Sequence, residues 1–350
     1  MINYYHPQVW ADLDEMFERS IPFAALQNKT VLITGATGML ASYVAFALIH
    51  LNHRLNLNIR PVLLARSQDK LNSVYGEVLS DLHCLVQDVT EPIVYDGTID
   101  FIFHAAGAAS PHYILNDPVG IINANVIGTQ RVLDCACMAG TQKVVFASTR
   151  EVYGRVADKT LISEDDMGVL DPLHPRDCYP ESKRLAEAMM MAYYQQYQVP
   201  FNTLRIAHTY GPGMQIENDG RVMADLINDA VNQRNIVLKS SGEAERAFCY
   251  ITDAVDAILR VMLTGVHAQA YNVANESEPI SILNLAKLLQ QLANFGKGIS
   301  KQQVNNNQAG YTNYPRTALS TERLQDLGWE PVVTLEDGLK RTLCSLGCVK

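Results

Sequence analysis

The 350-residue sequence lacks the features of membrane-spanning, secreted and metal-binding proteins. No apolar run approaches the roughly 20 residues of a membrane-spanning helix, and residues 1–20 carry Asp and Glu where a signal peptide would carry basic and then apolar residues. The seven cysteines form no CxxC pairs at zinc spacing, and their odd number favours reduced thiols. We therefore expect a cytoplasmic protein with no bound metal and no membrane partner.

Positive charge is also scarce. The sequence has 28 Lys and Arg residues and 37 Asp and Glu residues, which gives a net charge of −9. A protein of this charge has no general field that would attract nucleic acid. An anionic ligand would need a local cluster of Arg side chains or backbone N–H groups. The 48% hydrophobic and 19% charged residues are typical of a globular protein.

Short apolar runs alternate with longer helical patterns as far as residue 206. Continuous apolar strands separated by helices predict a parallel sheet that is covered on both faces. The predicted fold class is therefore α/β, a Rossmann-type doubly wound parallel sheet. The predicted strands are 30–34, 61–65, 99–104, 143–148 and 201–206, and the predicted helices are 39–51, 119–138 and 178–198.

The pattern changes after residue 207, where shorter elements with more Gly, Pro and Asn begin. The chain is expected to divide into an N-terminal helical extension (1–28), a dinucleotide-binding domain (29–207 plus about 248–275) and a smaller, partly interleaved α/β substrate domain (208–247 and 276–350). Residues 249–263 are expected to return to the main sheet. The Asn- and Gln-rich residues 302–310 are typical of a surface loop.

The first predicted strand runs into Gly-Ala-Thr-Gly at 35–38, and a helix follows. Such a turn lets backbone N–H groups and the helix N-terminus approach a pyrophosphate, because glycine has no Cβ to block the phosphate. A plain helix-capping turn is the alternative, and the alternating context favours the dinucleotide site. The predicted cofactor-binding residues here are Gly35, Thr37, Gly38, Met39 and Leu40.

The end of the second predicted strand bears on which dinucleotide is bound. An acidic residue there would bind the ribose 2′-hydroxyl, whereas Arg would favour a 2′-phosphate. The strand ends with Ala65-Arg66 and has no carboxylate, which favours NADP over NAD unless Arg66 stacks on adenine or faces water. Asp88 and Val89 are expected on the adenine side with either cofactor.

Tyr179 and Lys183 lie four residues apart in YPESK and would share one face of a helix. A nearby ammonium favours a phenolate and lowers the pKa of a tyrosine. Tyr179 could then take a proton from a substrate hydroxyl while a hydride leaves for a nicotinamide. A Tyr-x-x-x-Lys pattern alone is common on helix surfaces, but here it accompanies the glycine turn and a strand-end hydroxyl, Thr149.

Together these residues resemble the extended short-chain dehydrogenase/reductase family. The likeness covers about residues 30–343 and is greatest to UDP-glucuronate decarboxylases, then to dTDP-glucose 4,6-dehydratases. The stretches that carry it are AAGAASPHY (105–113), DPLHPRDCYPESKR (171–184), NDGRVMADLI (218–227), AERAFCYITDA (244–254) and LGWEPVVTLEDGL (327–339). The resemblance implies a nucleotide-sugar substrate, a tightly bound dinucleotide (NAD by this likeness) and a homodimer.

The resemblance also implies roles for single residues. Thr149 would hydrogen-bond the C4 oxygen of the sugar, Tyr179 would be the base with Lys183 as its partner, and Glu151 would be an acid or base. The implied cofactor contacts are Ala105, Ala106 and Gly107, with Tyr179 and Lys183, and the implied substrate contacts are Ser110, Arg221, Arg246 and Arg316. Arginine suits a diphosphate because its fork gives two charge-assisted hydrogen bonds.

Arg150 and His208 depart from the family pattern. Relatives have a small hydroxyl residue or an aspartate in place of Arg150, so no evident acid remains to protonate a leaving C6 hydroxyl, and 4,6-dehydration is disfavoured. Arg150 would clamp a C6 carboxylate, pair with Glu151, or point away into a structural salt bridge. His208 replaces an asparagine and would donate to phosphate, act as an acid or base, or fill the asparagine's role. Both are predicted to bind substrate, and Arg150 also to take part in catalysis.

The leading prediction is an enzyme that passes through a 4-keto sugar. Oxidation at C4 makes a C6 carboxylate a β-keto acid, which loses CO₂ readily, while Glu151 would move a proton at C5. Epimerisation at C3, C4 or C5 uses the same intermediate and is the alternative. A non-catalytic dinucleotide-binding regulator is the alternative of another class. Outside the site, His104 is expected to be structural, and residues 164–165 are expected to form a solvated acidic lid.

Overall fold

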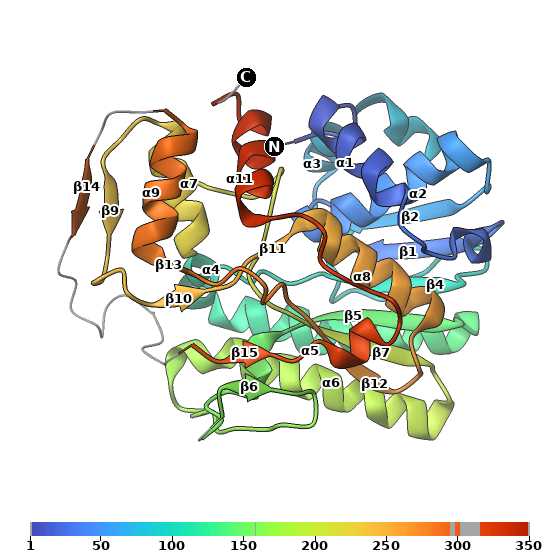
Figure 1. The fold of residues 1–350 in the computed structure, drawn as a ribbon. Coiled ribbons are helices and arrows are strands. Elements are labelled where there is room, and N and C mark those ends of the chain that lie inside the picture. The colour runs from blue at the N-terminus through green and yellow to red at the C-terminus, as the bar shows by residue number, and fades with distance from the viewer. Residues whose placement is uncertain (1, 158, 295–297, 302–315, 349–350) are drawn as a thin grey trace.

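A parallel sheet of seven strands runs through the centre of the protein (Figure 1). This computed structural model describes residues 2–157, 159–294, 298–301 and 316–348. The strand order is β12-β7-β5-β4-β1-β2-β3, and all neighbouring pairs are parallel. The strands are β1 (Thr30–Thr34), β2 (Arg60–Ala65), β3 (His83–Val86), β4 (Phe101–His104), β5 (Lys143–Thr149), β7 (Phe201–Ile206) and β12 (Gln269–Val273).

The strand order reverses between β1 and β4. Ile33 of β1 aligns with Leu63 of β2 on one side and with Phe103 of β4 on the other. In open parallel sheets, ligands bind outside the carboxyl ends of the strands at such a reversal. The segments that follow β1, β4 and β5 all leave the sheet at this edge, so the fold brings together stretches that are far apart in the sequence.

Apolar side chains on both faces of the central strands hold the sheet between two helical layers. In β1, Val31 and Ile33 belong to one buried cluster and Leu32 to another. The first face is covered by α2 (Met39–Leu55) and α8 (Ile251–Thr264), and the second by α5 (Pro118–Ala139) and α6 (Cys178–Tyr197) (Figure 1). Burial on both faces explains why β1 is a continuous apolar run without alternation.

A buried carboxylate on α1 (Pro7–Phe17) ties the N-terminal segment to the body of the protein. Asp12 is fully buried and accepts hydrogen bonds from the hydroxyls of Tyr43 (3.1 Å) and Tyr250 (2.8 Å). Arg341 of α11 (Leu335–Ser345) lies 3.2 Å from the other oxygen of this carboxylate. A buried charge is tolerated only when it is paired and hydrogen-bonded, so the position of α1 depends on all three partners.

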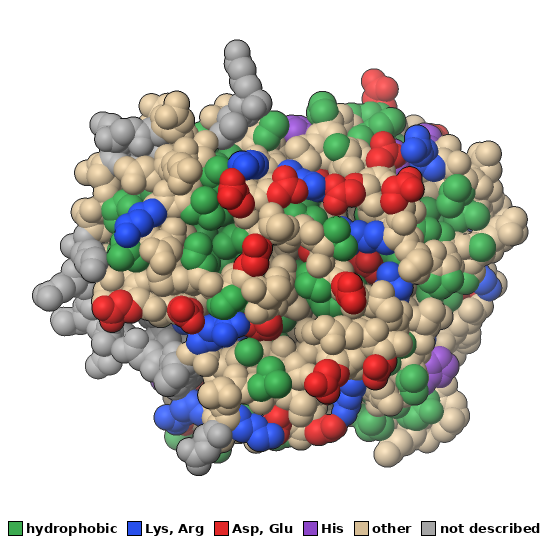
Figure 2. Space-filling model, in the orientation of Figure 1, with side chains coloured by type: hydrophobic (Ala, Val, Ile, Leu, Met, Phe, Trp, Pro, Cys, Tyr) green, Lys and Arg blue, Asp and Glu red, His purple; other side chains and the backbone are tan. Residues whose placement is uncertain are grey.

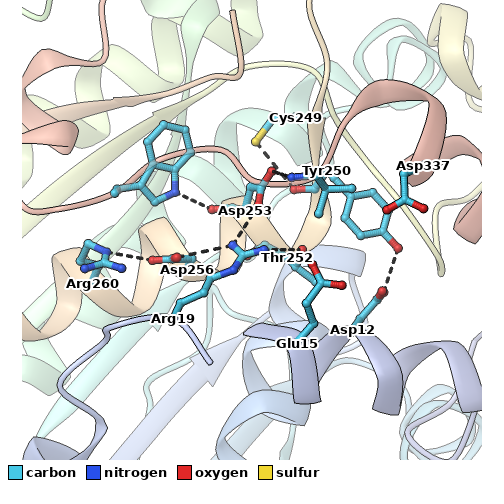
Figure 3. A network of polar contacts seen from close by, with 12 residues as sticks. Asp12, Glu15, Arg19, Cys249, Tyr250, Thr252, Asp253, Asp256, Arg260 and Asp337 are labelled. Carbon is cyan, nitrogen blue, oxygen red and sulfur yellow. Dashed lines mark hydrogen bonds and ion pairs between the residues drawn. The ribbon is translucent and has the colours of Figure 1, made fainter. Parts of the chain in front are cut away.

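A second ion pair joins the end of this segment to α8 (Figure 3). Arg19 Nη1 lies 2.9 Å from Asp253 Oδ1 and 3.4 Å from Asp256 Oδ2, and both aspartates are buried. The predicted N-terminal extension therefore packs into the helical layer over the sheet. The helix α1 itself ends at Phe17.

A smaller group of elements lies beside the sheet, at the left of Figure 1. In this group α7 (Val222–Val231) and α9 (Ile282–Leu292) pack together, and β9 (Ile236–Leu238) pairs in parallel with β14 (Ile299–Lys301). The remaining elements are α3 (Gln68–Tyr75), α4 (Pro111–Asn116), α10 (Glu322–Gln325), β6 (Leu161–Ile162), β8 (Thr209–Tyr210), β10 (Glu245–Arg246), β11 (Cys249–Tyr250), β13 (Ile280–Ser281), β15 (Ala318–Leu319), η1 (Phe23–Leu26), η2 (Gly76–Asp81), η3 (Arg150–Tyr153) and η4 (Pro175–Asp177).

The predicted α/β fold is confirmed, and each predicted strand and helix is present with small shifts at its ends. The prediction that residues 249–263 return to the sheet is wrong in detail, because they form β11 and α8, and the following β12 enters the sheet. Sequence patterns missed β3 and β12, which are the two edge strands and carry partly exposed or polar residues. The expected loop at 302–310 lies outside the described residues.

Acidic and basic side chains are intermixed on the face of the protein that Figure 2 shows. Several of them pair within a helix, as Lys340 and Glu336 do at 2.6 Å. Among the helices within the described residues, none combines the length and the hydropathy that a bilayer span requires.

Candidate active site

The loop between β1 and α2 closes tightly against the loop after β4. Gly35 has φ +69°, and a Cβ built on it would lie 2.9 Å from the carbonyl oxygen of Ala105, so only glycine fits. Gly38 is the N-cap of α2 and provides no side-chain hydrogen bond to the first N–H groups of that helix. Such an N-terminus beside a glycine turn suits a phosphate, so the loop fits the pyrophosphate of a dinucleotide. The other residues predicted here, Thr37, Met39 and Leu40, lie partly exposed in the same turn.

Thr34 holds the loop after β4 in place. Its hydroxyl accepts hydrogen bonds from the N–H groups of Ala105 (3.2 Å) and Ala106 (3.1 Å) and lies 2.8 Å from Nδ1 of His104. His104 is fully buried, and burial lowers the pKa of its imidazole to about 3. The imidazole is therefore neutral at neutral pH, and His104 has the structural role that we expected.

Two buried polar atoms beside this loop have no hydrogen-bond partner among the described residues: Ser110 Oγ and Asn125 Oδ1. A Cβ added to Gly107, which has φ +143°, would lie 2.7 Å from Asn125 Oδ1. Asn125 also donates a hydrogen bond to Ser182 Oγ at 2.9 Å. Buried polar atoms are nearly always satisfied, so these atoms point to a polar ligand or ordered water. Ser110 was predicted, whereas Asn125, inside a helical pattern, gave no sequence signal.

Arg66 follows β2, and its side chain is 79% exposed with Nη1 3.8 Å from the carboxylate of Asp88. Asp88 also accepts hydrogen bonds from the N–H (2.9 Å) and the hydroxyl (2.8 Å) of Thr90. Val89 is buried, and its side chain packs so closely on Gly128 of α5 that an added Cβ would lie 2.8 Å away. Arg66 and Asp88 are thus accessible to a ligand at this edge, whereas the side chain of Val89 belongs to the core.

The predicted catalytic residues Thr149, Tyr179 and Lys183 come together where α6 packs on β5. Thr149 ends β5, Tyr179 is in the first turn of α6, and all three residues are buried. Thr149 lies near enough to Tyr179 that its hydroxyl acts to lower the pKa of the phenol. Lys183 Nζ donates a hydrogen bond to the carbonyl of Ala147 at 2.8 Å and lies 4.4 Å from the ring centre of Phe146.

Burial dominates the protonation of the tyrosine and the lysine. It raises the pKa of Tyr179, as does the Glu151 carboxylate to a lesser degree, while Thr149 and Arg176 act in the opposite direction. Burial lowers the pKa of Lys183 to about 7. The predicted depression of the tyrosine pKa by the ammonium is therefore wrong for this structure, in which desolvation outweighs the neighbouring cations.

Arg176 was missed by the sequence analysis, although it lies in the stretch LHPRDCYPESK. It donates two hydrogen bonds to the carboxylate of Glu151, from Nη1 to Oε2 at 2.6 Å and from Nη2 to Oε1 at 3.1 Å. Its Nε is buried and has no partner among the described residues. The alternative in which Arg150 pairs with Glu151 is therefore wrong for this structure, because Arg176 occupies both oxygens of the carboxylate. The only sequence signal for Arg176 was its position three residues before Tyr179.

Arg150 begins η3 and points into the protein. Its Nη1 donates a hydrogen bond to Nε2 of His208 at 3.1 Å, and its Nη2 donates one to the carbonyl of Thr317 at 3.3 Å. The alternative in which Arg150 points away into a structural salt bridge is wrong for the described residues, since none of their carboxylates lies within 4.0 Å of it. Burial, and then Arg150, lowers the pKa of His208 to about 3, so a neutral imidazole, not an acid, faces the site.

Three of the predicted arginines lie near His208. Burial lowers the pKa of its imidazole most, and Arg150, Arg246 and Arg221 lower it further. Arg221 donates to both oxygens of the buried Asp219, at 2.5 and 2.8 Å. Arg316 pairs with Glu276 and lies close enough to Arg150 to oppose its charge. Local positive charge at the site therefore comes from Arg150 and Arg246, which have no ion pair among the described residues.

The expected acidic lid at residues 164–165 is wrong for Glu164. This residue is buried, and its Oε1 accepts a hydrogen bond from the N–H of Asn272 at 2.8 Å. Burial raises the pKa of Glu164. Asp165 is exposed and pairs with Arg323. Glu164 is therefore a structural link between its loop and β12.

Comparison with known proteins agrees with this geometry. The sequence profile described as "NAD dependent epimerase/dehydratase family" matches residues 31–274. The chain is 32% identical over 338 residues to "UDP-glucuronic acid decarboxylase 1" of Xenopus tropicalis, with 95% of this chain and 76% of that protein covered. It is 33% identical over 316 residues to "UDP-glucuronic acid decarboxylase 5" of Arabidopsis thaliana, with 89% and 87% covered.

Solved structures share the fold at lower sequence identity. A UDP-glucose 4-epimerase of Thermotoga maritima with UDP-glucose matches with a TM-score of 0.75 at 21% identity, covering 91% of this chain and 98% of that one. A dTDP-glucose 4,6-dehydratase of Bacillus anthracis in complex with NAD matches with a TM-score of 0.74 at 20% identity, covering 91% and 96%. The chain belongs to the NAD dependent epimerase/dehydratase family and is an enzyme of that family.

Proposed function

We propose that this enzyme oxidises a nucleotide sugar at C4 and decarboxylates it, with UDP-glucuronate as its substrate. The observation that carries the proposal is the buried Thr149–Tyr179 pair beside Lys183, with two arginines, Arg150 and Arg246, that have no carboxylate partner among the described residues. The relatives named as UDP-glucuronic acid decarboxylases support it. The smaller group of elements beside the sheet would hold the nucleotide part of this substrate.

The first step would be carried by the residues at the end of β5 and the start of α6. Tyr179 would take the proton of the C4 hydroxyl, and Thr149 would hold the C4 oxygen. Bound NAD or NADP would accept the hydride from C4. The phenolate that this step needs is opposed by burial and favoured by Arg176 and Arg221. Lys183, held by the Ala147 carbonyl, would orient the cofactor and the tyrosine.

The second step would follow from the C4 ketone. A C6 carboxylate is then β to a carbonyl, so the C5–C6 bond breaks with loss of CO₂ and its electron pair passes into an enolate at C5 and C4. Protonation at C5 and return of the hydride to C4 give a pentose. Glu151, oriented by the two hydrogen bonds from Arg176, would move the proton at C5.

The test is to incubate the purified protein with UDP-glucuronate and NAD or NADP and to analyse the products by mass spectrometry. We expect CO₂ and a UDP-pentose. Epimerisation at C3, C4 or C5 would pass through the same ketone, and a product of unchanged mass that separates from UDP-glucuronate in chromatography would establish that reaction instead. Recovery of unreacted substrate, with unaltered affinity for the dinucleotide in the Tyr179→Phe variant, would favour a regulator.

We also propose that the enzyme accepts NADP as well as NAD. The end of β2 carries no carboxylate that would repel a 2′-phosphate. Arg66 is largely exposed, and its Nη1 lies 3.8 Å from the carboxylate of Asp88, so the guanidinium remains accessible to a ligand. The test is the affinity of both dinucleotides for the wild type and for Arg66→Gln. We expect the substitution to weaken NADP selectively. Equal effects on both dinucleotides would refute a contact with the 2′-phosphate.

A homodimer formed through α5 and α6 is a further proposal. These two helices pack together and expose large apolar side chains, including Val119, Ile122, Met138 and Leu185. Exposed apolar patches of this kind mark interaction surfaces. Light scattering should give the mass of a dimer, and Leu185→Glu should shift it toward the monomer.

A further inference from the structure

Arg150 and Arg246 differ from the other arginines around the site because neither forms an ion pair with a carboxylate of the described residues. Arg176, Arg221 and Arg316 each pair with a carboxylate. No carboxylate of the described residues lies within 4.0 Å of Arg150 or Arg246. Burial lowers the pKa of both guanidiniums, and Arg150 adds to this for Arg246. Arg316 also lowers the pKa of Arg150, while the more distant carboxylates of Glu276 and Glu151 raise it. Both side chains are partly buried, and two partly buried like charges are costly without a counter-charge. Within the described part of the chain, the two guanidiniums are therefore left able to bind an anionic ligand.

The guanidinium of Arg150 is held in a fixed direction. An arginine has only donors, so the 3.1 Å contact requires that Nε2 of His208 accept the hydrogen bond from Nη1. Nη2 is used at the same time by the Thr317 carbonyl. Two of the five N–H donors are therefore committed to the protein, and the others remain for a ligand. His208 acts here as an acceptor that orients an arginine.

The backbone at His208 supports this assignment. Its φ is +46°, in the left-handed region where His, Asn and Asp are enriched among residues other than glycine. Asparagine would suit this backbone equally well, but its side chain is shorter and would not reach Arg150 with the same acceptor. Arg150 and His208 are thus two departures from the family pattern that form one structural unit.

The position of Arg150 indicates which anionic group of the ligand it would bind. It directly follows Thr149, the residue proposed to hold the C4 oxygen, whereas Arg221 and Arg316 are already neutralised. An anion at Arg150 therefore belongs to the sugar ring. The carboxylate on C6 is the charged group of a uronate, and a guanidinium matches its two oxygens.

We propose that Arg150 is a specificity-determining residue that binds the sugar carboxylate together with Arg246, and that His208 is its positioning residue. This inference rests on the proposed function, because it presumes a nucleotide sugar in this site. It goes further in assigning the preference for a uronate over a neutral hexose to Arg150 and His208.

The experiment is a calorimetric titration of the enzyme with UDP-glucuronate, UDP-glucose and UDP, with the reduced dinucleotide present so that the sugar is not oxidised. For Arg150→Gln we expect the Kd of UDP-glucuronate to rise roughly 10- to 100-fold, the loss of a charged hydrogen-bonded contact, with little change for UDP-glucose or UDP. Arg155→Gln, an exposed arginine in the same segment, is the matched control and should change none of the three.

His208 variants separate positioning from general damage. His208→Asn suits the backbone but loses the reach to Arg150, and it should weaken UDP-glucuronate selectively. His208→Gln keeps a longer acceptor and should restore much of the selectivity. Adding His208→Asn to Arg150→Gln should cause little further loss, because both changes remove the same contact.

The outcomes are distinct. Equal weakening of all three ligands by Arg150→Gln, or additive losses in the double variant, would overturn the assignment of Arg150 and His208 while leaving decarboxylation intact. A wild type that binds UDP-glucuronate no better than UDP-glucose would also overturn it. A wild type that binds no UDP-containing ligand would overturn the proposed function itself, and the assignment with it.

Discussion

Arg176 Nη1 and Nη2 each donate a hydrogen bond to a different carboxylate oxygen of Glu151, at 2.6 and 3.1 Å. A bidentate pair fixes the plane of the carboxylate as well as its charge. Arg176 stands three residues before Tyr179 and favours its phenolate, so one guanidinium acts on both groups that are proposed to move protons. This contact makes Arg176 a positioning residue whose loss has a measurable signature.

Arg176→Gln should lower kcat for UDP-glucuronate by roughly 10- to 100-fold, with a smaller change in KM, because Glu151 loses its orientation while the ligand contacts remain. Arg176→Lys should be intermediate, since lysine keeps the charge without the fork. Steady-state kinetics measures both. Arg234→Gln, a half-exposed arginine paired with Asp229 on α7, is the control. An unchanged kcat in Arg176→Gln would contradict the positioning role.

Replacing Tyr179 by Phe should reduce turnover by at least roughly 10²- to 10⁴-fold, because the acceptor of the C4 proton is removed. Absorbance of the reduced dinucleotide, followed after mixing with UDP-glucuronate, reports the first step directly. Tyr197→Phe, at the exposed end of α6, should behave as the wild type. A Tyr179→Phe variant that still reduces the dinucleotide at the wild-type rate would remove the phenol from the mechanism.

His104 should make the stability of the protein depend on pH. Burial lowers the pKa of its imidazole to about 3 in the folded state, against about 6.5 in an unfolded chain. The unfolded state therefore binds the proton first as the pH falls. The stabilisation by the neutral imidazole is complete above pH 6.5 and is lost progressively toward pH 3, reaching roughly 2 kcal/mol of loss at pH 5.

Urea denaturation at pH 7 and pH 5 measures this effect. The free energy of unfolding of the wild type should fall more between the two pH values than that of His104→Asn, because the variant has no titratable side chain at position 104. His53→Asn, at an exposed histidine of α2, should keep the slope of the wild type. Equal slopes in the wild type and in His104→Asn would show that His104 does not titrate as a buried neutral group.

Asp12 should be critical for stability and unimportant for chemistry. Its removal in Asp12→Ala leaves Arg341 without one carboxylate partner and two tyrosine hydroxyls without an acceptor, which should cost roughly 3 kcal/mol or more of unfolding free energy. Asp14→Ala, on the same helix but with a side chain 43% exposed, should cost well under that. Urea denaturation compares them. Similar losses in both variants would contradict the anchoring role of the buried network in Figure 3.

Composition, apolar runs and two short motifs were sufficient to predict the α/β class and most of the elements. The buried strand 30–34, its glycine turn and the spacing of Tyr179 from Lys183 are local features, and local steric and periodic rules apply to them directly. The edge strands β3 and β12 were not predicted from the sequence, because edge strands are less buried and their sequences are less apolar.

The tertiary structure alone decided how the charges of the site are paired. Arg150 is adjacent to Glu151 in the sequence, whereas Arg176 lies 25 residues further on. Nothing in the local sequence shows which of the two arginines pairs with the Glu151 carboxylate. That choice follows from α6 packing on β5, which brings Arg176 to Glu151 and turns Arg150 toward His208 on the segment after β7. Ion pairs across such distances depend on burial and on the whole fold, because desolvation sets both their cost and their strength.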